Sequence, residues 1–239
     1  PTTALYGVEK AADTRCYPAS TTKILTCIVA LENGSLDDAV SISAAACDFS
    51  KYNSLMGLAE GESYTLRDLL YGLMLVSGND AAIAVAEAIG GSVDGFVSLM
   101  NTKAQELGMS SSHFVSPHGK HNDEHYTTAR DMAVLTAYAL KNSDFCDIVG
   151  AKSYTASELG SGKTIPLTNA NRLLVDATGD GFTPISCLYE YAIGVKTGAP
   201  TYGMVKFSTR VAIDKPAGLV HFATFTIDNV QVPTEPGKA

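Results

Sequence analysis

The spacing of apolar residues is helical through the first two thirds of the chain. Leu66, Leu69 and Leu73 recur three and four residues apart, which places them on one face of a helix. Signals for helix ends lie where such patterns begin and stop, because Ser, Thr and Asp favour the first turn and Gly follows the last. On this basis we predict that residues 20–150 are mostly helical, with helices over residues 20–32, 65–76, 80–89, 92–107 and 128–140.

After residue 150 the pattern changes to short runs of β-branched and aromatic residues between Gly, Pro and Asp. One more short strand is expected at 40–43, and the segments 44–57 and 113–126 are expected to be irregular. The pattern therefore predicts a helical lobe over roughly 20–150 and a sheet lobe mainly over 151–228. The later strands are predicted over residues 163–167, 192–197, 205–213 and 219–227, with a turn at 214–218 joining the last two.

Composition and charge exclude several classes of partner. The chain has 239 residues, of which 46% are hydrophobic and 18% charged, as in a folded domain with a sizeable core. Its net charge of -8 argues against a nucleic-acid partner and a polybasic membrane anchor, since both need clustered positive charge. No apolar stretch approaches the ~20 residues that span a bilayer. We therefore expect any signal peptide or anchor to lie outside these residues.

The cysteines favour neither a disulfide framework nor a zinc ribbon. Their number, five, is odd, and no pair shows the C-x-x-C spacing. We expect most of them to be small apolar side chains, Cys27 on its helix especially, although one bridge stays open. The cysteines are Cys16, Cys27, Cys47, Cys146 and Cys187.

Ser20 and Lys23 are the first candidates for chemistry. They stand three residues apart at the expected start of a helix, after Pro18, so their side chains would share one face. A hydroxyl and an amine held that close can act as nucleophile and base if burial or a nearby cation removes the amine's proton. The Ser-x-x-Lys pattern is short enough to occur by chance, so it needs support from elsewhere in the chain.

Two further short motifs supply that support. Ser77-Gly78-Asn79 lies at the predicted break between two apolar helices, where small residues can aim polar side chains into a cleft. Lys196-Thr197-Gly198 ends a predicted strand with a cation and a hydroxyl. Each motif alone is also ordinary turn chemistry. Together the three follow the order of the S-x-x-K, S-D-N and K-T-G signature of class A β-lactamases and penicillin-binding proteins, with Gly78 in place of Asp.

The residues around these motifs carry a closer resemblance. The stretches 18–23, 70–82, 117–119 and 128–131 resemble the serine-type D-alanyl-D-alanine carboxypeptidases, which are low-molecular-mass penicillin-binding proteins. The resemblance runs from about Leu5 to about Ile227. It implies an α+β fold of the β-lactamase and transpeptidase type, with an antiparallel sheet and an inserted helical lobe. Residues 1–239 would form one catalytic domain, and we expect the family's N-terminal strand and C-terminal helix to be trimmed from it.

The resemblance also implies roles for the residues of the first two motifs. Ser20 would attack the carbonyl between two D-alanines, and Lys23 would take its proton. Ser77 would relay that proton towards the leaving amine. Asn79 would hold the amide of the substrate.

The third motif would bind the end of the substrate. Lys196 and Thr197 would bind the peptide's terminal carboxylate, and the charge of Lys196 would help to keep the neighbouring amine neutral. Gly198 would let the substrate backbone approach the strand. The oxyanion would sit between two backbone N–H groups, of the nucleophile and of Ala199. Arg172 lies where the family places an arginine near the carboxylate site, and a surface arginine is the equal alternative.

The histidines of the segment 113–126 raise the question of a metal. His118, His121 and His125 lie close together in sequence with Asp123 and Glu124 between them, and these are ligand types that zinc accepts. Their spacing matches no zinc-peptidase pattern. The segment instead resembles the Pro-His-Gly loop of the family, so we expect a structural loop beside the cleft, no metal and no cofactor.

We therefore expect a serine DD-carboxypeptidase that removes the terminal D-alanine from peptidoglycan stem peptides outside the cytoplasmic membrane, and that β-lactam antibiotics acylate and inhibit. A β-lactamase would share the first serine and lysine, but it needs efficient deacylation. Class A enzymes use a glutamate in a Glu-x-x-x-Asn setting, which Glu106, Glu124, Glu158 and Glu190 all lack. A related serine esterase and a catalytically silent wall-peptide binding module stay open as alternatives.

Overall fold

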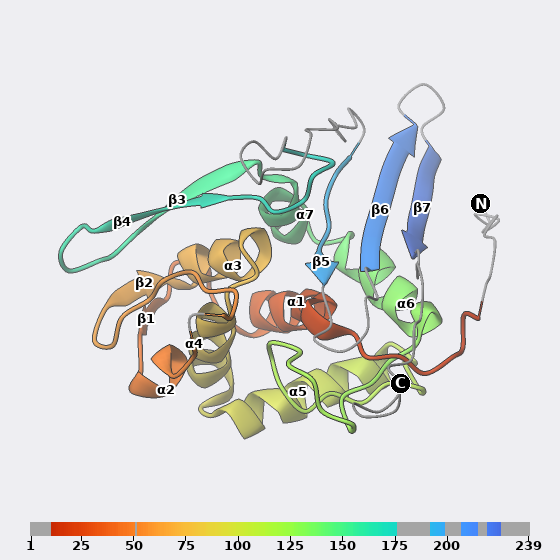
Figure 1. Ribbon diagram of the computed structural model, residues 1–239, viewed down its shortest axis with the longest axis horizontal. Coiled ribbons are helices and arrows are strands. Elements are labelled where there is room, and N and C mark those ends of the chain that lie inside the picture. The colour runs from red at the N-terminus through yellow and green to blue at the C-terminus, as the bar shows by residue number, and fades with distance from the viewer. Residues whose placement is uncertain (1–10, 51, 176–191, 199–206, 215–218, 226–239) are drawn as a thin grey trace, which may run out of the picture.

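The computed structural model describes residues 11–50, 52–175, 192–198, 207–214 and 219–225. The strands of this part form three antiparallel sheets (Figure 1). They are β1 (Ala39–Ser41) with β2 (Ser63–Thr65), β3 (Ser153–Ser157) with β4 (Thr164–Thr168), and β5 (Thr197–Gly198) with β6 (Phe207–Asp214) and β7 (Leu219–Phe225). The helices are the 3₁₀ turn η1 (Ala19–Thr22), then α1 (Lys23–Asn33), α2 (Ala44–Cys47), α3 (Leu66–Leu75), α4 (Asn79–Gly90), α5 (Val93–Glu106), α6 (Ala129–Ala139) and α7 (Ser143–Gly150).

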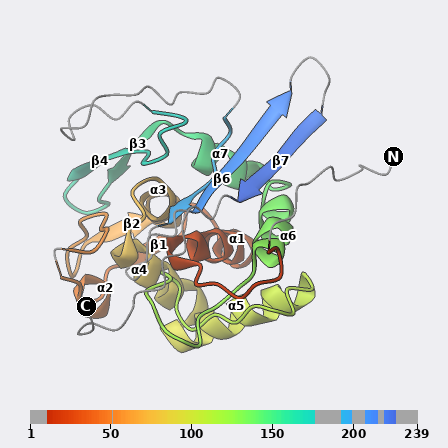
Figure 2. The same cartoon turned by 45° about the vertical axis from the view of Figure 1, so that its right-hand side comes forward.

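Helix α1 is the centre of the molecule. Every residue from Lys23 to Ala30 is buried, because α3, α4, α5, α6 and α7 all pack around this helix. The β5–β7 sheet lies on one side of α1 and α6, and α5 lies on the opposite side (Figures 1 and 2). Burying an Ile or Leu side chain contributes about 1.5–3 kcal/mol, and α1 buries Ile24, Leu25 and Ile28 almost completely. The residues that begin this helix are therefore fixed to the most tightly packed part of the fold.

The predicted helices agree with the structure to within a few residues. The helix after Thr65 ends where Ser77-Gly78-Asn79 was expected to break it, and the next helix ends at a left-handed Gly91. The loop 113–126 is found as expected, closed by a bridge between His113 and Tyr126. Most of the predicted strand 163–167 is β4. The strands predicted at 205–213 and 219–227 correspond to β6 and β7, and most of the turn between them lies outside the described residues.

Several predicted elements were wrong in detail. Ser20 does not begin an α-helix but lies in η1, because Ala19 takes a positive φ of 48° and the chain enters the helix through a tighter turn. The segment 44–57 contains the short helix α2, whose first turn is capped by Ser43. The strand expected over 192–197 is confined to Thr197–Gly198. Elements β2, β3 and α7 were not predicted, because their runs are too short to show a period.

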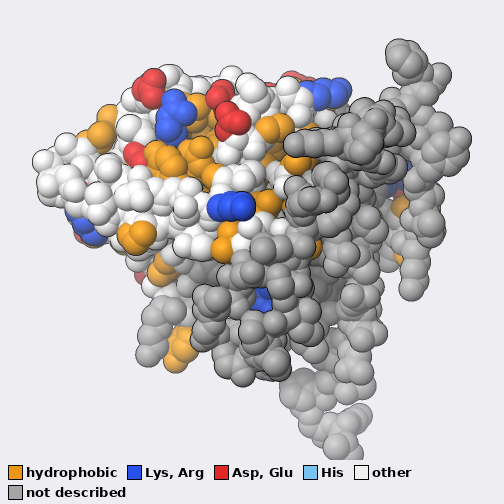
Figure 3. Space-filling model, turned by 90° about the horizontal axis from the view of Figure 1, so that it is seen from above, with side chains coloured by type: hydrophobic (Ala, Val, Ile, Leu, Met, Phe, Trp, Pro, Cys, Tyr) orange, Lys and Arg blue, Asp and Glu red, His pale blue; other side chains and the backbone are white. Residues whose placement is uncertain are grey.

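The surface of the described residues mixes acidic and basic side chains (Figure 3), and it presents no long apolar helix. No single helix of the described residues is long and apolar enough to cross a membrane, and α4 with α5 meets the length and composition only as a pair bent by 84°. On the face shown in Figure 3, acidic and basic side chains are interspersed among small apolar areas.

The capping box that begins α3 links this helix to the β3–β4 hairpin. The Thr65 hydroxyl accepts from the Asp68 N–H, and one carboxylate oxygen of Asp68 accepts from the Thr65 N–H. The other carboxylate oxygen accepts from Tyr154 Oη at 3.0 Å and from the Ser157 N–H at 3.3 Å. One buried carboxylate therefore serves two elements.

Replacing Thr65 with Ala should lower the free energy of unfolding by about 1 kcal/mol, because the orphan N–H groups of α3 lose a partner. Urea unfolding measures the change. Thr102→Ala is the matched control, since Thr102 is exposed in the middle of α5 and Ala is the better helix former there. Equal losses in both variants would contradict a capping role for Thr65.

Candidate active site

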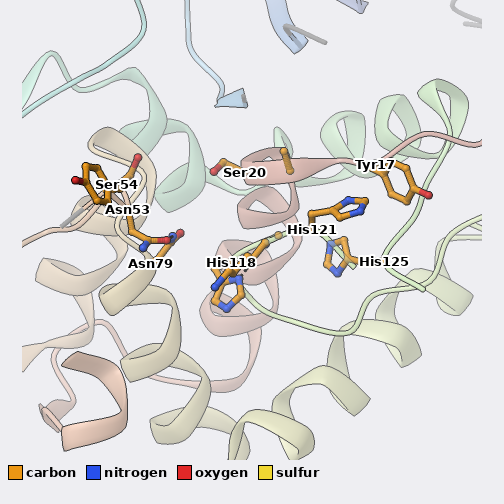
Figure 4. Close-up of a pocket in the computed structure, with 12 residues that line it drawn as sticks. Tyr17, Ser20, Asn53, Ser54, Asn79, His118, His121 and His125 are labelled. Carbon is orange, nitrogen blue, oxygen red and sulfur yellow. Dashed lines mark hydrogen bonds between the residues drawn. The ribbon is translucent and has the colours of Figure 1, made fainter. Parts of the chain in front are cut away.

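Ser20 lies at the edge of a polar pocket just before the central helix. Figure 4 shows it with Asn53, Ser54 and Asn79 on one side and with His121, His125 and Tyr17 on the other. The turn that carries Ser20 is held by the Thr21 hydroxyl, which donates to Pro18 O at 2.6 Å. The predicted Ser-x-x-Lys pair is close in space, with Lys23 Nζ 3.2 Å from Ser20 Oγ.

Lys23 is the most unusual side chain in the molecule, because a lysine is rarely buried without an ion pair. Its side chain is 0% exposed. Nζ donates to Asn79 Oδ1 at 2.7 Å and to the backbone carbonyl of His118 at 3.0 Å. Burial and then the charge that Lys196 carries when it is protonated hold the pKa of Lys23 well below its usual value, and the Asp80 carboxylate opposes this shift. The charged form of this amine is therefore disfavoured.

In the uncharged form of this amine, the hydrogen bonds decide which way the lone pair faces. An uncharged amine has two N–H donors and one lone pair, and its two shorter contacts go to carbonyl oxygens, which only accept. The third contact is Ser20 Oγ, which has a proton to give. The lone pair of Lys23 therefore faces the hydroxyl of Ser20, which is the arrangement that a base needs.

The second motif forms the junction between α3 and α4. Ser77 has a positive φ of 62°, and its hydroxyl oxygen is buried without a hydrogen-bond partner among the described residues. A side chain at Gly78 would place its Cβ 2.9 Å from Asp80 Oδ1 and 3.1 Å from Met56 N. This crowding explains why glycine stands where the signature has Asp. Asn79 begins α4 and turns its side chain to Lys23.

Asp80 is a residue of this site that the sequence analysis missed. Its carboxylate is buried and accepts from the backbone N–H groups of Met56 at 2.8 Å, Gly57 at 2.8 Å and Leu58 at 3.2 Å. It thereby fixes the segment that carries Asn53 and Ser54 beside Asn79. An acidic residue in the first turn of a helix is a weak signal, so only the fold reveals this role.

The third motif approaches the nucleophile from the other side. The Lys196 side chain is 3% exposed, and its Nζ donates to Thr197 O at 2.9 Å. Burial lowers the pKa of Lys196 to about 7. A Cβ at position 198 would lie 3.1 Å from Thr21 Cγ2 and 3.3 Å from Thr21 N. Gly198 therefore lets β5 pack closely against η1. This is a different reason for a glycine at this position from the approach of the substrate backbone that was expected from the sequence.

Of the expected site residues that the structure describes, Ser20 and Asn79 line the pocket. Lys23, Ser77, Lys196, Thr197, Gly198 and Arg172 are not among its lining residues. Arg172 is exposed. Ala199 lies outside the described residues, as does Cys187. The other four cysteines are free thiols, and Cys27 is buried on α1 as expected.

The histidines of the loop 113–126 are held by hydrogen bonds and ring contacts. The His118 ring packs edge-on against Phe49, and burial lowers the pKa of its imidazole to about 3. His121 lies 3.6 Å from Asp123 Oδ1, and His125 Nε2 lies 2.8 Å from Thr22 Oγ1. Within the described residues, no group of three or more His, Cys, Asp or Glu side chains converges as a metal site would.

Comparison with known proteins identifies the family. A family model described as D-alanyl-D-alanine carboxypeptidase matches residues 5–183. The chain belongs to this family. It is 40% identical to the D-alanyl-D-alanine carboxypeptidase of Streptomyces sp. strain K15, over 82% of this chain and 68% of that one. It is 35% identical to the carboxypeptidase DacF of Bacillus subtilis, over 73% of this chain but only 47% of that relative.

Solved structures of related carboxypeptidases and transpeptidases share the fold. The Streptomyces K15 DD-transpeptidase superposes with a TM-score of 0.79 at 37% identity, covering 91% of this chain and 83% of that one. A D-alanyl-D-alanine carboxypeptidase of Mycobacterium tuberculosis superposes with a TM-score of 0.76 at 29% identity, covering 92% and 77%. The expected α+β fold, the family and the enzyme class, a serine D-alanyl-D-alanine carboxypeptidase, are confirmed by these matches, which favour none of the alternatives.

The low pKa of Lys196 predicts a pH-dependent stability. Between a folded-state pKa of about 7 and the unfolded value of about 10.4, only the unfolded chain binds a proton at this group. The contribution of Lys196 to the free energy of unfolding therefore rises with pH, by up to about 1.4 kcal/mol per pH unit.

Urea unfolding between about pH 7.5 and 8.5 tests this on Lys196→Met. The free energy of unfolding of the variant, relative to that of the wild type, should fall as the pH rises across this range. Lys163→Met is the control, because the Lys163 ammonium pairs with Glu62 at the surface, 2.7 Å from its carboxylate. Parallel curves for the wild type and Lys196→Met would show that Lys196 is protonated in the folded protein.

Proposed function

We propose that this chain is a serine DD-carboxypeptidase that removes the terminal D-alanine of peptidoglycan stem peptides through an acyl-enzyme on Ser20. One observation carries the proposal. The buried Nζ of Lys23 lies 2.7 Å from Asn79 Oδ1, 3.0 Å from His118 O and 3.2 Å from Ser20 Oγ, so an uncharged amine would turn its lone pair to the Ser20 hydroxyl. The membership of the family supplies the substrate class.

In the acylation step, the Ser20 hydroxyl gives its proton to Lys23 Nζ while its oxygen attacks the carbonyl carbon of the D-Ala-D-Ala bond. The Ser77 hydroxyl, which is buried and has no hydrogen-bond partner among the described residues, passes a proton from the Lys23 ammonium to the leaving amine, and the C–N bond breaks. Water then attacks the ester, Lys23 accepts its proton, and Ser20 recovers that proton as the tetrapeptide leaves. Each residue returns to its starting protonation state.

Substrate binding uses the other motifs. Lys196 and Thr197 bind the terminal carboxylate, and an anion beside a buried lysine raises its pKa, so the ligand restores the charge that burial removes. Asn79 Nδ2, now 3.3 Å from Asn53 Oδ1, is the donor for a substrate amide carbonyl. Gly198 completes the edge of β5, and the N–H groups of Ser20 and Ala199 bind the oxyanion. Arg172 is exposed and does not line the pocket beside Ser20, which favours the alternative of a surface arginine.

The partners and location follow from the same chemistry. The substrate is a peptidoglycan stem peptide ending in D-Ala-D-Ala, so the enzyme works on the outer side of the cytoplasmic membrane. β-Lactam antibiotics acylate Ser20 and remain bound, because no Glu-x-x-x-Asn setting supplies a base for rapid deacylation. The K15 structure of similar fold is titled a DD-transpeptidase. Supplying an amine acceptor in the assay separates transfer from hydrolysis at the same acyl-enzyme.

Labelling with a fluorescent penicillin, followed by peptide mass spectrometry, should find the adduct on Ser20. Lys23→Ala should reduce labelling by a factor of about 100 or more, because the step loses its base. Lys163→Ala, at a surface ion pair, should label like the wild type. An adduct at any other residue, or normal labelling of Lys23→Ala, would remove the assigned residue from its role.

Release of free D-alanine from a D-Ala-D-Ala peptide tests the substrate. The wild type should release it, and Ser20→Ala should not. Labelling by penicillin without any release would favour the silent binding module, and turnover of simple esters alone would favour an esterase.

A further inference from the structure

His125 closes the loop that lies over the nucleophile turn. Its imidazole is 1% exposed and bridges two parts of the chain. Val115 N donates to His125 Nδ1 at 3.1 Å, which joins the beginning of the loop to its end. On the other side of the ring, Nε2 lies 2.8 Å from Thr22 Oγ1, in the turn that carries Ser20. The sequence offered this residue only as a possible zinc ligand or as part of a structural loop.

The two hydrogen bonds fix the protonation of the ring. A backbone N–H only donates, so Nδ1 must accept and carries no proton. The proton of the neutral ring therefore lies on Nε2, which donates to the Thr22 hydroxyl. Burial lowers the pKa of His125 to about 4, and His113 contributes in the same direction, so the ring stays in this form near neutral pH.

The loop closed by His125 is docked on η1 and the first turn of α1 at several points. His118 O accepts from Lys23 Nζ at 3.0 Å, and Pro117 O accepts from Thr26 Oγ1 at 2.6 Å. Gly119 lies so near the turn that a Cβ there would approach Ala19 O to 1.8 Å. The position of the His118 carbonyl, and with it the direction of the Lys23 lone pair, therefore depends on how firmly this loop is seated.

Thr22 is the point at which His125 holds the turn. Thr22 follows Ser20 by two residues and precedes Lys23 directly, and it is 0% exposed. A hydrogen bond to its hydroxyl restrains the backbone between nucleophile and base. Neither Thr22 nor His125 touches Ser20 or Lys23 through its side chain in the hydrogen bonds of the structure.

We propose that His125 is a positioning residue for acylation: its Nε2–H donates to Thr22 and thereby holds the loop 115–125 against the nucleophile turn, so that the His118 carbonyl orients Lys23 towards Ser20. This inference rests on the proposed function, because its effect is measured on the acyl-enzyme at Ser20. A histidine that only fills the core would affect stability but not the rate of the chemical step.

Two substitutions of His125 separate its two hydrogen bonds. The Asn amide occupies the place of Nδ1, so His125→Asn keeps an acceptor for Val115 N and loses the donor to Thr22. The Gln amide nitrogen reaches the place of Nε2, so His125→Gln keeps the donor and loses the acceptor. Thr22→Val removes the hydroxyl at nearly constant volume, and Thr22→Ser retains it. His113→Asn is the control within the same loop, since the His113 side chain makes one hydrogen bond among those described, from Nδ1 to Glu124 O.

Stopped-flow acylation by a chromogenic β-lactam gives a limiting rate constant and an apparent dissociation constant, and thermal unfolding gives the stability of each variant. His125→Asn and Thr22→Val should lower the limiting rate constant by about 10-fold or more with little change in the dissociation constant. Their combination should be no slower than either alone. Thr22→Ser, His125→Gln and His113→Asn should stay within about 2-fold of the wild type, with His125→Gln losing stability because Val115 N lacks a partner.

The inference would be overturned if the limiting rate constants of both His125 variants fell in proportion to their thermal stability. Additive effects of Thr22→Val and His125→Asn on the limiting rate constant would overturn it too. If His125→Asn does not fold, Thr22→Val against Thr22→Ser decides the same point. Normal rates in all of these variants, with the wild type acylated at Ser20, would overturn the positioning role and leave the proposed function standing. A wild type that is not acylated at Ser20 would overturn both.

Discussion

An uncharged amine in the interior is the condition on which the rest of this structure depends. Burying an ammonium ion without a partner is costly, and burial accordingly shifts the pKa of Lys23 well below its usual value. Among the described residues, the hydrogen-bond partners of its Nζ are a hydroxyl, an amide oxygen and a backbone carbonyl, and none is a carboxylate. The carboxylate that opposes the lowering of the Lys23 pKa is that of Asp80, which accepts from four backbone N–H groups, those of Met56, Gly57, Leu58 and Ala81.

The arrangement around this amine draws on four separate parts of the chain. Ser20 and Lys23 belong to the entry of the central helix, Asn79 to the start of α4, Lys196 to the edge of β5, and the His118 carbonyl to the loop that follows α5. Packing around α1 holds these parts together, because the helix is buried on every side. Ser20 and Lys23 therefore stand at the start of a deeply buried helix, which suits a site that needs fixed geometry.

The sequence predicted the elements whose signals are local. The Thr65 capping box, the Gly91 end of α4 and the Ser-x-x-Lys pair depend on residues within one or two turns of each other. The prediction failed where the determining contact is distant. Ser20 lies in a 3₁₀ turn because Gly119 and Gly198 pack against it from remote segments, and nothing near position 20 indicates this. Asp80 and His125 act on backbone groups far along the chain, so their roles appear only in the fold.

The most direct measurement is the protonation of Lys23 itself, read from the NMR signals of isotopically labelled lysine side chains and assigned by comparison with Lys23→Met. The account predicts a resonance of an uncharged amine at pH 7 that titrates well below the ordinary lysine pKa of about 10.4. A Lys23 signal that stays charged up to the pH at which the surface lysines titrate would contradict it.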